Sequence, residues 1–239
     1  MFSIDQDFMI RENLLKLKER ISFACAKAGV KEETVEIVAV AKGRGIMQIR
    51  EALACGITDI GENRVQEAIL KHKHLTPSTY NLAPIKWHML GHLQTNKVKE
   101  AVRIFDLIQS VDSTRLAEAI DKEAGKIGKI QDILIEVKVS PEATKSGLKP
   151  EEVPEALKEI SQLKNINLKG LMTIAPQTSD PEKARPFFRA LRQLRDKISK
   201  LWTVDCGLWT LSMGMTDDFQ VAIEEGATMI RIGRAIFEG

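Results

Sequence analysis

Short apolar, β-branched runs alternate with longer segments of helical spacing along most of this chain. The runs predicted as strands are Glu36–Ala41, Ile57–Gly61, Ile85–Leu90, Asp106–Val111, Ile130–Val139, Leu168–Thr173, Trp209–Met213 and Thr228–Ile232. Every run except the last is followed by a helical pattern. Strands joined by such helices form parallel βαβ units, and eight units in this length favour a closed (β/α)8 barrel, or TIM barrel, over a doubly wound sheet.

A further helical pattern precedes the first strand. Apolar residues recur at helical spacing from Asp7 onward, and Gly29 follows the last of them, which is a typical helix stop. No stretch rich in Pro, Gly or Ser divides the 239 residues, and no second composition appears. We therefore expect a single domain over residues 1–239, with an extra helix within residues 1–30.

Composition argues against several classes of partner. The net charge of +2 is too close to balance to indicate a polyanion, and no apolar run approaches the length of a membrane span. The N-terminal residues lack the pattern of a signal peptide. Cys25, Cys55 and Cys206 are far apart and form no CxxC motif, which favours a reducing compartment. We expect a cytoplasmic, monomeric protein with no membrane partner.

Lys42 directly follows the first predicted strand and precedes Gly43. Barrel enzymes carry their chemistry at the carboxyl ends of the strands. A lysine there is expected to be poorly hydrated, which favours the neutral amine that Schiff-base chemistry with an aldehyde requires. The alternative is a lysine that only ends a strand and whose ammonium group reaches solvent.

The ends of the last two strands carry features of a phosphate site. In many barrels a phosphate binds to the loops after strands seven and eight. Ser212 offers a hydroxyl there, and Gly214 and Gly233 let backbone N–H groups approach an anion, although glycines that only serve turns are the alternative. Arg231 interrupts an apolar run, so it is predicted to point into the barrel mouth, toward either an ion-pair partner or a ligand.

A lysine, a phosphate site and an inward arginine on one face of a barrel indicate a phosphorylated aldehyde as ligand. Pyridoxal 5′-phosphate (PLP) has both groups, and its ring nitrogen would face Arg231. A cation beside that nitrogen disfavours its protonation and so makes PLP a weak electron sink. The residues therefore favour a protein that holds PLP or supports mild proton chemistry.

Eight motifs occur in order between residues 35 and 239. They are Val-Ala-Val-Ala-Lys (38–42), Gly-Glu-Asn-Arg-Val-Gln-Glu (61–67), Trp-His-Met-Leu-Gly-His-Leu-Gln-Thr-Asn-Lys (87–97), Ser-Val-Asp (110–112), Lys-Ser-Gly (145–147), Gly-Leu-Met (170–172), Leu-Ser-Met-Gly-Met-Thr-Asp-Asp-Phe (211–219) and Gly-Ala-Thr-Met-Ile-Arg-Ile-Gly (226–233). This set resembles the YggS/PROSC family of PLP-binding proteins, also called PLP homeostasis proteins.

The resemblance implies a barrel like the N-terminal domain of alanine racemase. It also implies a role in intracellular PLP homeostasis, in which the protein holds PLP as a Schiff base, buffers the free aldehyde and hands it to apo forms of PLP-dependent enzymes. The cofactor-binding residues that it implies are Lys42, Asn63, Met172, Ser212, Arg231, Gly233 and Arg234.

Each of these residues has an implied role. Lys42 would form the Schiff base, Arg231 would face the ring nitrogen, and Asn63 and Met172 would line the pocket. The phosphate would be held by Ser212 and by the backbone at 233–234.

The chain departs from the family pattern at three positions. Ala41 and Gly43 flank Lys42 where the family usually has Ser and Thr, so a polar contact near the amine is lost. Arg234 stands where a Thr or Ser often follows the Ile-Gly of the last strand. That change removes a hydroxyl from the expected phosphate site but keeps the backbone N–H, and the guanidinium of Arg234 is an alternative phosphate contact.

An amino-acid racemase of the same barrel type is the alternative function. Such an enzyme needs two proton-transfer groups on opposite faces of the cofactor. In the racemases that this barrel resembles, the second group is a tyrosine from the other subunit. The one tyrosine of this chain, Tyr80, lies in a proline-flanked loop, and no second domain is predicted. We therefore expect no robust catalytic activity; a Schiff-base aldolase fits the motifs less well.

Histidines and basic residues form further clusters. His88 and His92 are four residues apart, but they flank the end of a strand and no third ligand is evident, so no metal site is predicted. Two basic segments are interpreted as solvated faces rather than nucleic-acid sites. The first segment contains Lys71, His72, Lys73 and His74. The second contains Lys183, Arg185, Arg189, Arg192, Arg195, Lys197 and Lys200.

Overall fold

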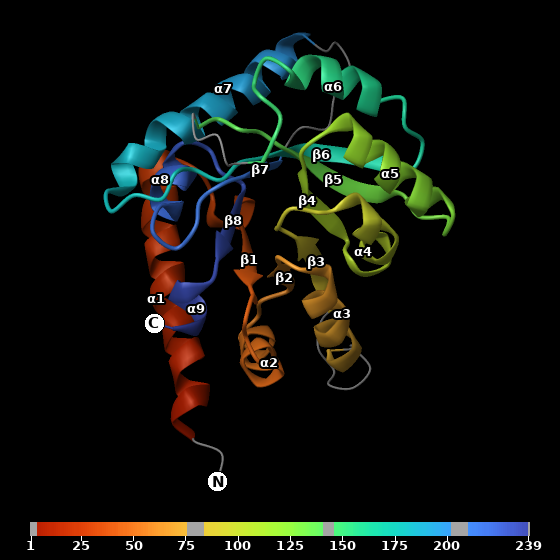
Figure 1. The fold of residues 1–239 in the computed structure, drawn as a ribbon. Coiled ribbons are helices and arrows are strands. Elements are labelled where there is room, and N and C mark those ends of the chain that lie inside the picture. The colour runs from red at the N-terminus through yellow and green to blue at the C-terminus, as the bar shows by residue number, and fades with distance from the viewer. Residues whose placement is uncertain (1–3, 76–83, 141–145, 202–209, 239) are drawn as a thin grey trace.

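A computed structural model describes residues 4–75, 84–140, 146–201 and 210–238, and Tyr80 lies outside these ranges. Parallel strands form a closed barrel in chain order (Figure 1). They are β1 (Glu36–Val40), β2 (Asp59–Glu62), β3 (Lys86–Met89), β4 (Leu107–Val111), β5 (Gln131–Glu136), β6 (Ile166–Met172), β7 (Thr210–Ser212) and β8 (Met229–Ile232). The barrel closes where β1 pairs with β8, with Val38 opposite Arg231. The predicted (β/α)8 barrel is confirmed.

Helices follow every strand and cover the outside of the barrel. They are α2 (Ile46–Ala54), α3 (Val65–His74), α4 (Val98–Ile104), α5 (Thr114–Gly125), α6 (Val153–Ile160), α7 (Arg185–Leu201), α8 (Phe219–Glu224) and α9 (Arg234–Phe237). The expectation that no helix follows the last strand is wrong, because α9 follows β8. Its four residues span one turn, which is too short to produce a hydrophobic period in the sequence.

Side-chain alternation along the strands gives the barrel a partly polar interior. Outward-facing strand residues pack against the helices and form the main hydrophobic core. The barrel interior holds a smaller apolar cluster of Val38, Leu90, Leu107, Leu134, Met172 and Met229. His88, Gln109, Ser212 and Arg231 are buried in the same interior. Polar groups enclosed in this way require hydrogen-bond partners, and these are described below.

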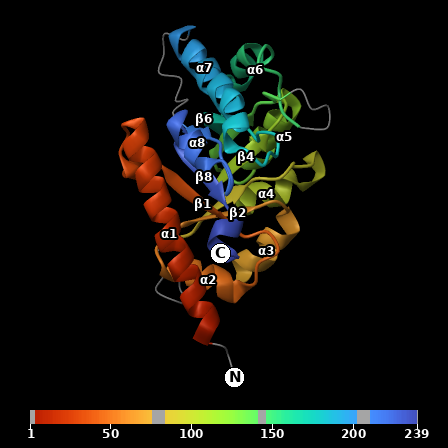
Figure 2. The same cartoon turned by 90° about the vertical axis from the view of Figure 1, so that its left-hand side faces the viewer.

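The N-terminal helix α1 (Ile4–Ala28) is present as predicted and runs along α8 and α9 (Figures 1 and 2). Its inner face is buried at Ile10, Leu14, Leu17, Ile21 and Ala24. The Asn13 amide donates to the carbonyl oxygen of Ile236 at 3.1 Å. The left-handed φ of Gly29 (+69°) follows the last turn, as the predicted helix stop requires.

Three arginines on the basic face of α7 are paired with carboxylates within the protein. Arg185 pairs with Glu182, Glu224 and Glu225, while Arg189 and Arg192 also bind Glu225. These arginines therefore pair with acidic side chains around α8 and are not a free cationic surface. In the part of the chain that the structure describes, no helix combines the length and apolar character needed to cross a bilayer.

Candidate ligand-binding site at the barrel mouth

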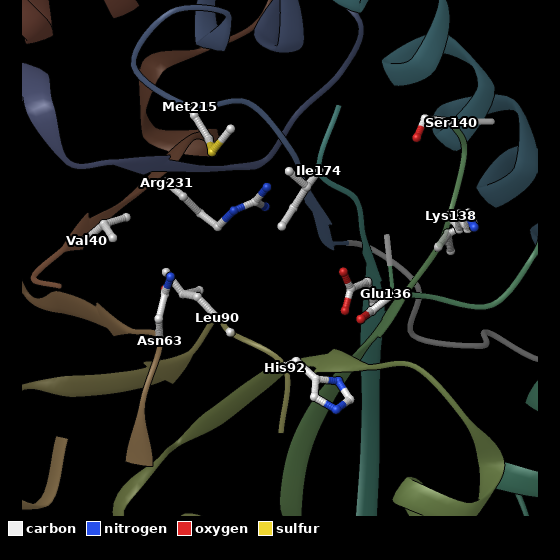
Figure 3. Close-up of a pocket in the computed structure, with 13 residues that line it drawn as sticks. Val40, Asn63, Leu90, His92, Glu136, Lys138, Ser140, Ile174, Met215 and Arg231 are labelled. Carbon is white, nitrogen blue, oxygen red and sulfur yellow. The ribbon is translucent and has the colours of Figure 1, made fainter. Parts of the chain in front are cut away.

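A cavity of about 290 Å³ opens at the carboxyl ends of the strands (Figure 3). Its walls come from seven of the strands or the residues just after them. The lining residues are Val40, Asn63, Leu90, Gly91, His92, Glu136, Val137, Lys138, Ser140, Ser146, Ile174, Met215 and Arg231. This is the end of the barrel at which TIM-barrel proteins bind their ligands.

Arg231 projects from β8 into this cavity, so its predicted inward orientation is confirmed (Figure 3). Its two terminal nitrogens donate to Ser212 Oγ at 2.6 Å and to the carbonyl oxygen of Thr173 at 2.7 Å. Burial lowers the pKa of Arg231 to about 10, against the opposing effect of the Asp218 and Glu136 carboxylates. The guanidinium therefore stays charged at neutral pH, and the groups that accept its hydrogen bonds among the described residues are a hydroxyl and a backbone carbonyl, both neutral.

Ser212 and Met172 lie deeper than the sequence suggested. Ser212 is fully buried; its hydroxyl accepts from Arg231 and donates to Gln109 Oε1 at 2.6 Å. Because a hydroxyl has one proton, Ser212 cannot also donate to a phosphate in this arrangement. Met172 packs in the interior apolar cluster beneath the cavity. Strand alternation identifies inward residues but does not give their depth in the barrel.

The two glycines of the predicted phosphate site differ in role. Gly214 has a left-handed φ of +93°, and a Cβ there would lie 2.6 Å from the Ala222 Cβ, so the turn and close packing explain this glycine. Gly233 has a negative φ, and a Cβ there would lie 3.5 Å from the Cβ of Val40, which lines the cavity. The amides of Gly233 and Arg234 donate to no acceptor among the described residues. The Arg234 guanidinium instead binds Asp217 at the surface.

Lys42 lies in a tight turn at the rim of the barrel. The Arg44 amide donates to the carbonyl oxygen of Ala41 at 2.9 Å, and Gly43 supplies the positive φ (+70°) that such a turn needs. The Lys42 side chain is exposed and does not line the cavity. The expected poor hydration of this lysine is therefore wrong, because β1 ends at Val40 and Lys42 is exposed in the turn that follows.

A buried ion pair between α3 and β2 holds this turn in place. Lys71 Nζ donates to the carbonyl oxygen of Ala41 at 2.6 Å and to Glu62 Oε1 at 2.5 Å. Glu62 is fully buried, and burial raises its pKa against the opposing effect of Lys71. The interpretation of Lys71 as part of a solvated basic face is wrong, since Lys71 is buried, whereas Lys73 and His74 of the same segment are exposed.

Glu136 is a cavity residue that the sequence analysis missed. It lies on the opposite side of the cavity from Arg231 (Figure 3). Burial and the nearby Asp112 carboxylate raise the pKa of Glu136 to about 7, against Arg231 and His92. The signal was present, because Glu136 is the one charged residue in the apolar run 133–137, just as Arg231 is in its own run.

The two histidines considered as metal ligands are separated. His88 is buried in the barrel interior, with Nε2 2.9 Å from Asp59 Oδ1. His92 lies at the cavity rim, with Nδ1 3.0 Å from Asp112 Oδ2. Their side chains thus serve different parts of the barrel.

Comparisons with known proteins agree with this geometry. Residues 10–239 match the family model described as the alanine racemase N-terminal domain. A pyridoxal phosphate homeostasis protein of Aquifex aeolicus is 44% identical over 226 residues, which are 95% of this chain and 96% of the relative. The chain belongs to the pyridoxal phosphate homeostasis protein family.

Solved structures place this family member among known folds. PipY of Synechococcus elongatus PCC7942, solved with PLP bound, has a TM-score of 0.82 and 37% identity over 95% of this chain and 99% of its own. Alanine racemase of Clostridium difficile 630 has a TM-score of 0.74 at 18% identity. The match covers 98% of this homeostasis-family chain and 56% of the racemase, and it shows a shared fold alone.

Proposed function

We propose that this protein binds PLP in the mouth cavity and takes part in PLP homeostasis in the cytoplasm. The observation that carries the proposal is Arg231, a buried and charged group that lines a cavity at the ligand-binding end of the barrel. A family relative solved with PLP bound supports it.

The residues around the cavity fit a phosphorylated aldehyde. Ser140 Oγ is buried in the wall and has no hydrogen-bond partner in the ranges that the structure describes. The free amides of Gly233 and Arg234 suit an anion, and a side chain at 233 would project toward Val40 at the cavity wall. Polar groups without internal partners in a cavity wall are available to a ligand.

The chain's own residues then divide the work of holding the cofactor. When bound, PLP supplies an aldehyde that combines reversibly with an amine, and Lys42 provides that amine at the rim. Arg231 presents N–H donors to an unprotonated ring nitrogen, and Asn63 lines the cavity. Ser212 and Met172 act from below, Ser212 by holding Arg231 and Met172 by filling the barrel interior.

Absorption spectroscopy of the purified protein tests this proposal. The protein loaded with PLP should show a Schiff-base absorption band, and Lys42→Ala should remove it. Borohydride reduction of the loaded protein should leave the cofactor covalently attached to the peptide that contains residue 42. Lys73→Ala, which removes an exposed lysine of α3, is the matched control and should keep the band. A band that persists in Lys42→Ala would place the cofactor on another amine.

Glu136 gives one reason to keep the racemase as a second candidate. A carboxyl group with a pKa near 7 inside the cavity is suited to proton transfer at neutral pH. Incubation of the loaded protein with single amino-acid enantiomers separates the two functions. Homeostasis predicts no change of stereochemistry above that of free PLP, whereas rapid racemisation that Glu136→Gln abolishes would favour the enzyme.

We also propose that the protein is a monomer and releases PLP to apo forms of PLP-dependent enzymes. Light scattering on the protein as it elutes from a size-exclusion column measures its molar mass and so tests whether it is a monomer. The proposed release predicts that an apoenzyme gains activity faster from the loaded protein than from buffer in which the same free PLP concentration is maintained. Equal rates would contradict direct release to the enzyme.

A further inference from the structure

Five polar side chains form one hydrogen-bonded series through the barrel interior. It runs from Arg231 Nη1 to Ser212 Oγ (2.6 Å), from Ser212 Oγ to Gln109 Oε1 (2.6 Å), from Gln109 Nε2 to His88 Nδ1 (2.9 Å) and from His88 Nε2 to Asp59 Oδ1 (2.9 Å). The five residues come from β8, β7, β4, β3 and β2, and all are buried. We call this series the interior polar chain.

Hydrogen-bond chemistry gives the interior polar chain one direction. Arg231 can only donate, so Ser212 Oγ accepts from it and uses its single O–H to donate to Gln109 Oε1. The Gln109 amide nitrogen can only donate, so His88 Nδ1 must be an unprotonated acceptor. His88 then carries its proton on Nε2 and donates to Asp59. One neutral tautomer of His88 therefore satisfies every bond.

The two ends of the chain carry opposite charges and reach different cavities. Arg231 lines the mouth cavity, while Asp59 and His88 line a second cavity of about 500 Å³ that also contains Glu36 and Thr210, the first residues of β1 and β7. Burial alone would raise the pKa of Asp59, but hydrogen bonds from His88 and Thr58 outweigh it and hold that pKa below its ordinary value. The series thus joins a buried cation to a carboxylate through three neutral groups.

We infer that Gln109 and His88 are positioning residues that orient Arg231 toward the ring nitrogen of bound PLP. The inference rests on the proposed function. Ser212 can accept from the guanidinium in a fixed direction only while its own proton has an acceptor, and Gln109 supplies that acceptor. His88 fixes Gln109 in turn, because it offers a lone pair to the amide nitrogen. Ser212 thereby holds Nη1 of Arg231, the Thr173 carbonyl holds Nη2, and the remaining N–H groups of the guanidinium are left for the cavity.

Nuclear magnetic resonance of the ligand-free protein tests the direction of the chain. In protein labelled with ¹⁵N in histidine, His88 should show an unprotonated Nδ1 and a protonated Nε2, identified by comparison with His88→Gln. Gln109→Leu should change the His88 signals and leave those of His92 in place. A His88 ring protonated at Nδ1 at neutral pH would overturn the inference, whether or not the protein binds PLP.

Substitutions with a matched control test the effect on the cofactor. Gln109→Leu and His88→Leu should shift the absorption band of bound PLP and weaken its binding about tenfold or more, since each removes bonds that hold a charged group. His88→Gln keeps an acceptor and a donor in the same order and should restore most of the band position and affinity. Gln131→Leu is the control, because Gln131 is equally buried but its amide donates only to the backbone carbonyl groups of Phe105, Asp106 and Asp132, at the amino ends of β4 and β5.

The outcomes separate a positioning role from a general loss of stability. Gln109→Leu and Gln131→Leu should both lower the unfolding midpoint, but only Gln109→Leu should change the spectrum. If both variants change the spectrum alike, or neither does, the positioning role is overturned. Failure of the unaltered protein to bind PLP would overturn the proposed function itself. The histidine ¹⁵N signals of the ligand-free protein test the hydrogen-bond directions separately, because they do not depend on PLP binding.

Discussion

Glu136 is a cavity residue whose charge changes near neutral pH. Its pKa is raised from the ordinary value of 4.5 to about 7 by burial and by Asp112. Between these two values the folded protein keeps a proton that the unfolded chain has lost. Stability contributed by this group therefore falls as pH rises from about 4.5, and the full loss is present above about pH 7.

Replacement of the Glu136 carboxyl group should remove this loss of folding stability at high pH. Glu136→Gln should be more stable than the unaltered protein by up to about 3 kcal/mol at pH 8, and close to it at pH 4.5. Denaturant unfolding of both proteins at the two pH values measures the difference. Glu155→Gln, at an exposed position of α6, is the control and should stay within about 0.5 kcal/mol throughout. An equal effect of Glu136→Gln at both pH values would contradict the raised pKa.

Gly214 is the residue at which backbone conformation and packing act together. Gly214→Ala should destabilise the protein by roughly 2–4 kcal/mol, because φ is +93° and the new methyl group would meet Ala222. Gly128→Ala separates the two causes: φ there is +66°, but no atom lies within 4 Å, so about 1–2 kcal/mol is expected. Equal unfolding midpoints for the two variants would show that packing against α8 contributes nothing.

The turn that carries Lys42 depends on α3, an element that sequence alone does not connect with it. Lys71→Met should destabilise the protein by about 3–5 kcal/mol, because it leaves the buried Glu62 carboxylate without its partner. The double variant with Glu62→Gln should recover part of that loss. Chemical denaturation measures both, with Lys73→Met as the exposed control. A Lys71→Met variant as stable as the control would mean that the pair does not hold the turn.

Element type and order could be predicted from the sequence because apolar periodicity reports burial directly. All eight strands and α1 were predicted this way, whereas α9 was missed because one turn has no period. Within the site, the sequence identified Arg231 as inward because a charge in an apolar run must be enclosed. The depth of Ser212, the outward turn of Lys42 and the burial of Lys71 could not be predicted, because they depend on contacts between residues distant in sequence.

At the scale of the molecule, α1 and the barrel share one continuous hydrophobic core. The buried residues of α1 belong to the same cluster as the outward faces of the strands and the inner faces of the helices around them. A helix joined to the barrel in this way should not unfold separately from it.

Two neighbouring leucines of α1 test this expectation. Leu17→Ala should cost about 2–5 kcal/mol, because Leu17 is 1% exposed, and Leu15→Ala should cost far less at 59% exposed. Circular dichroism and the fluorescence of the tryptophans, which include buried Trp87 of β3, should report one coincident transition for each protein. Separate transitions for the two signals would show that α1 is an independent unit.

The interior polar chain also limits how this barrel can diverge during evolution. Each of the three inner members, Ser212, Gln109 and His88, accepts a hydrogen bond from one neighbour and donates one to the other. An apolar replacement of any of them therefore leaves a polar group without its partner on each side. Descendants of this sequence should therefore keep a residue at 109 that accepts a hydrogen bond from the serine and donates one to the histidine, or exchange several of the five together. Correlated substitution at these five positions is the inheritance pattern to seek among relatives.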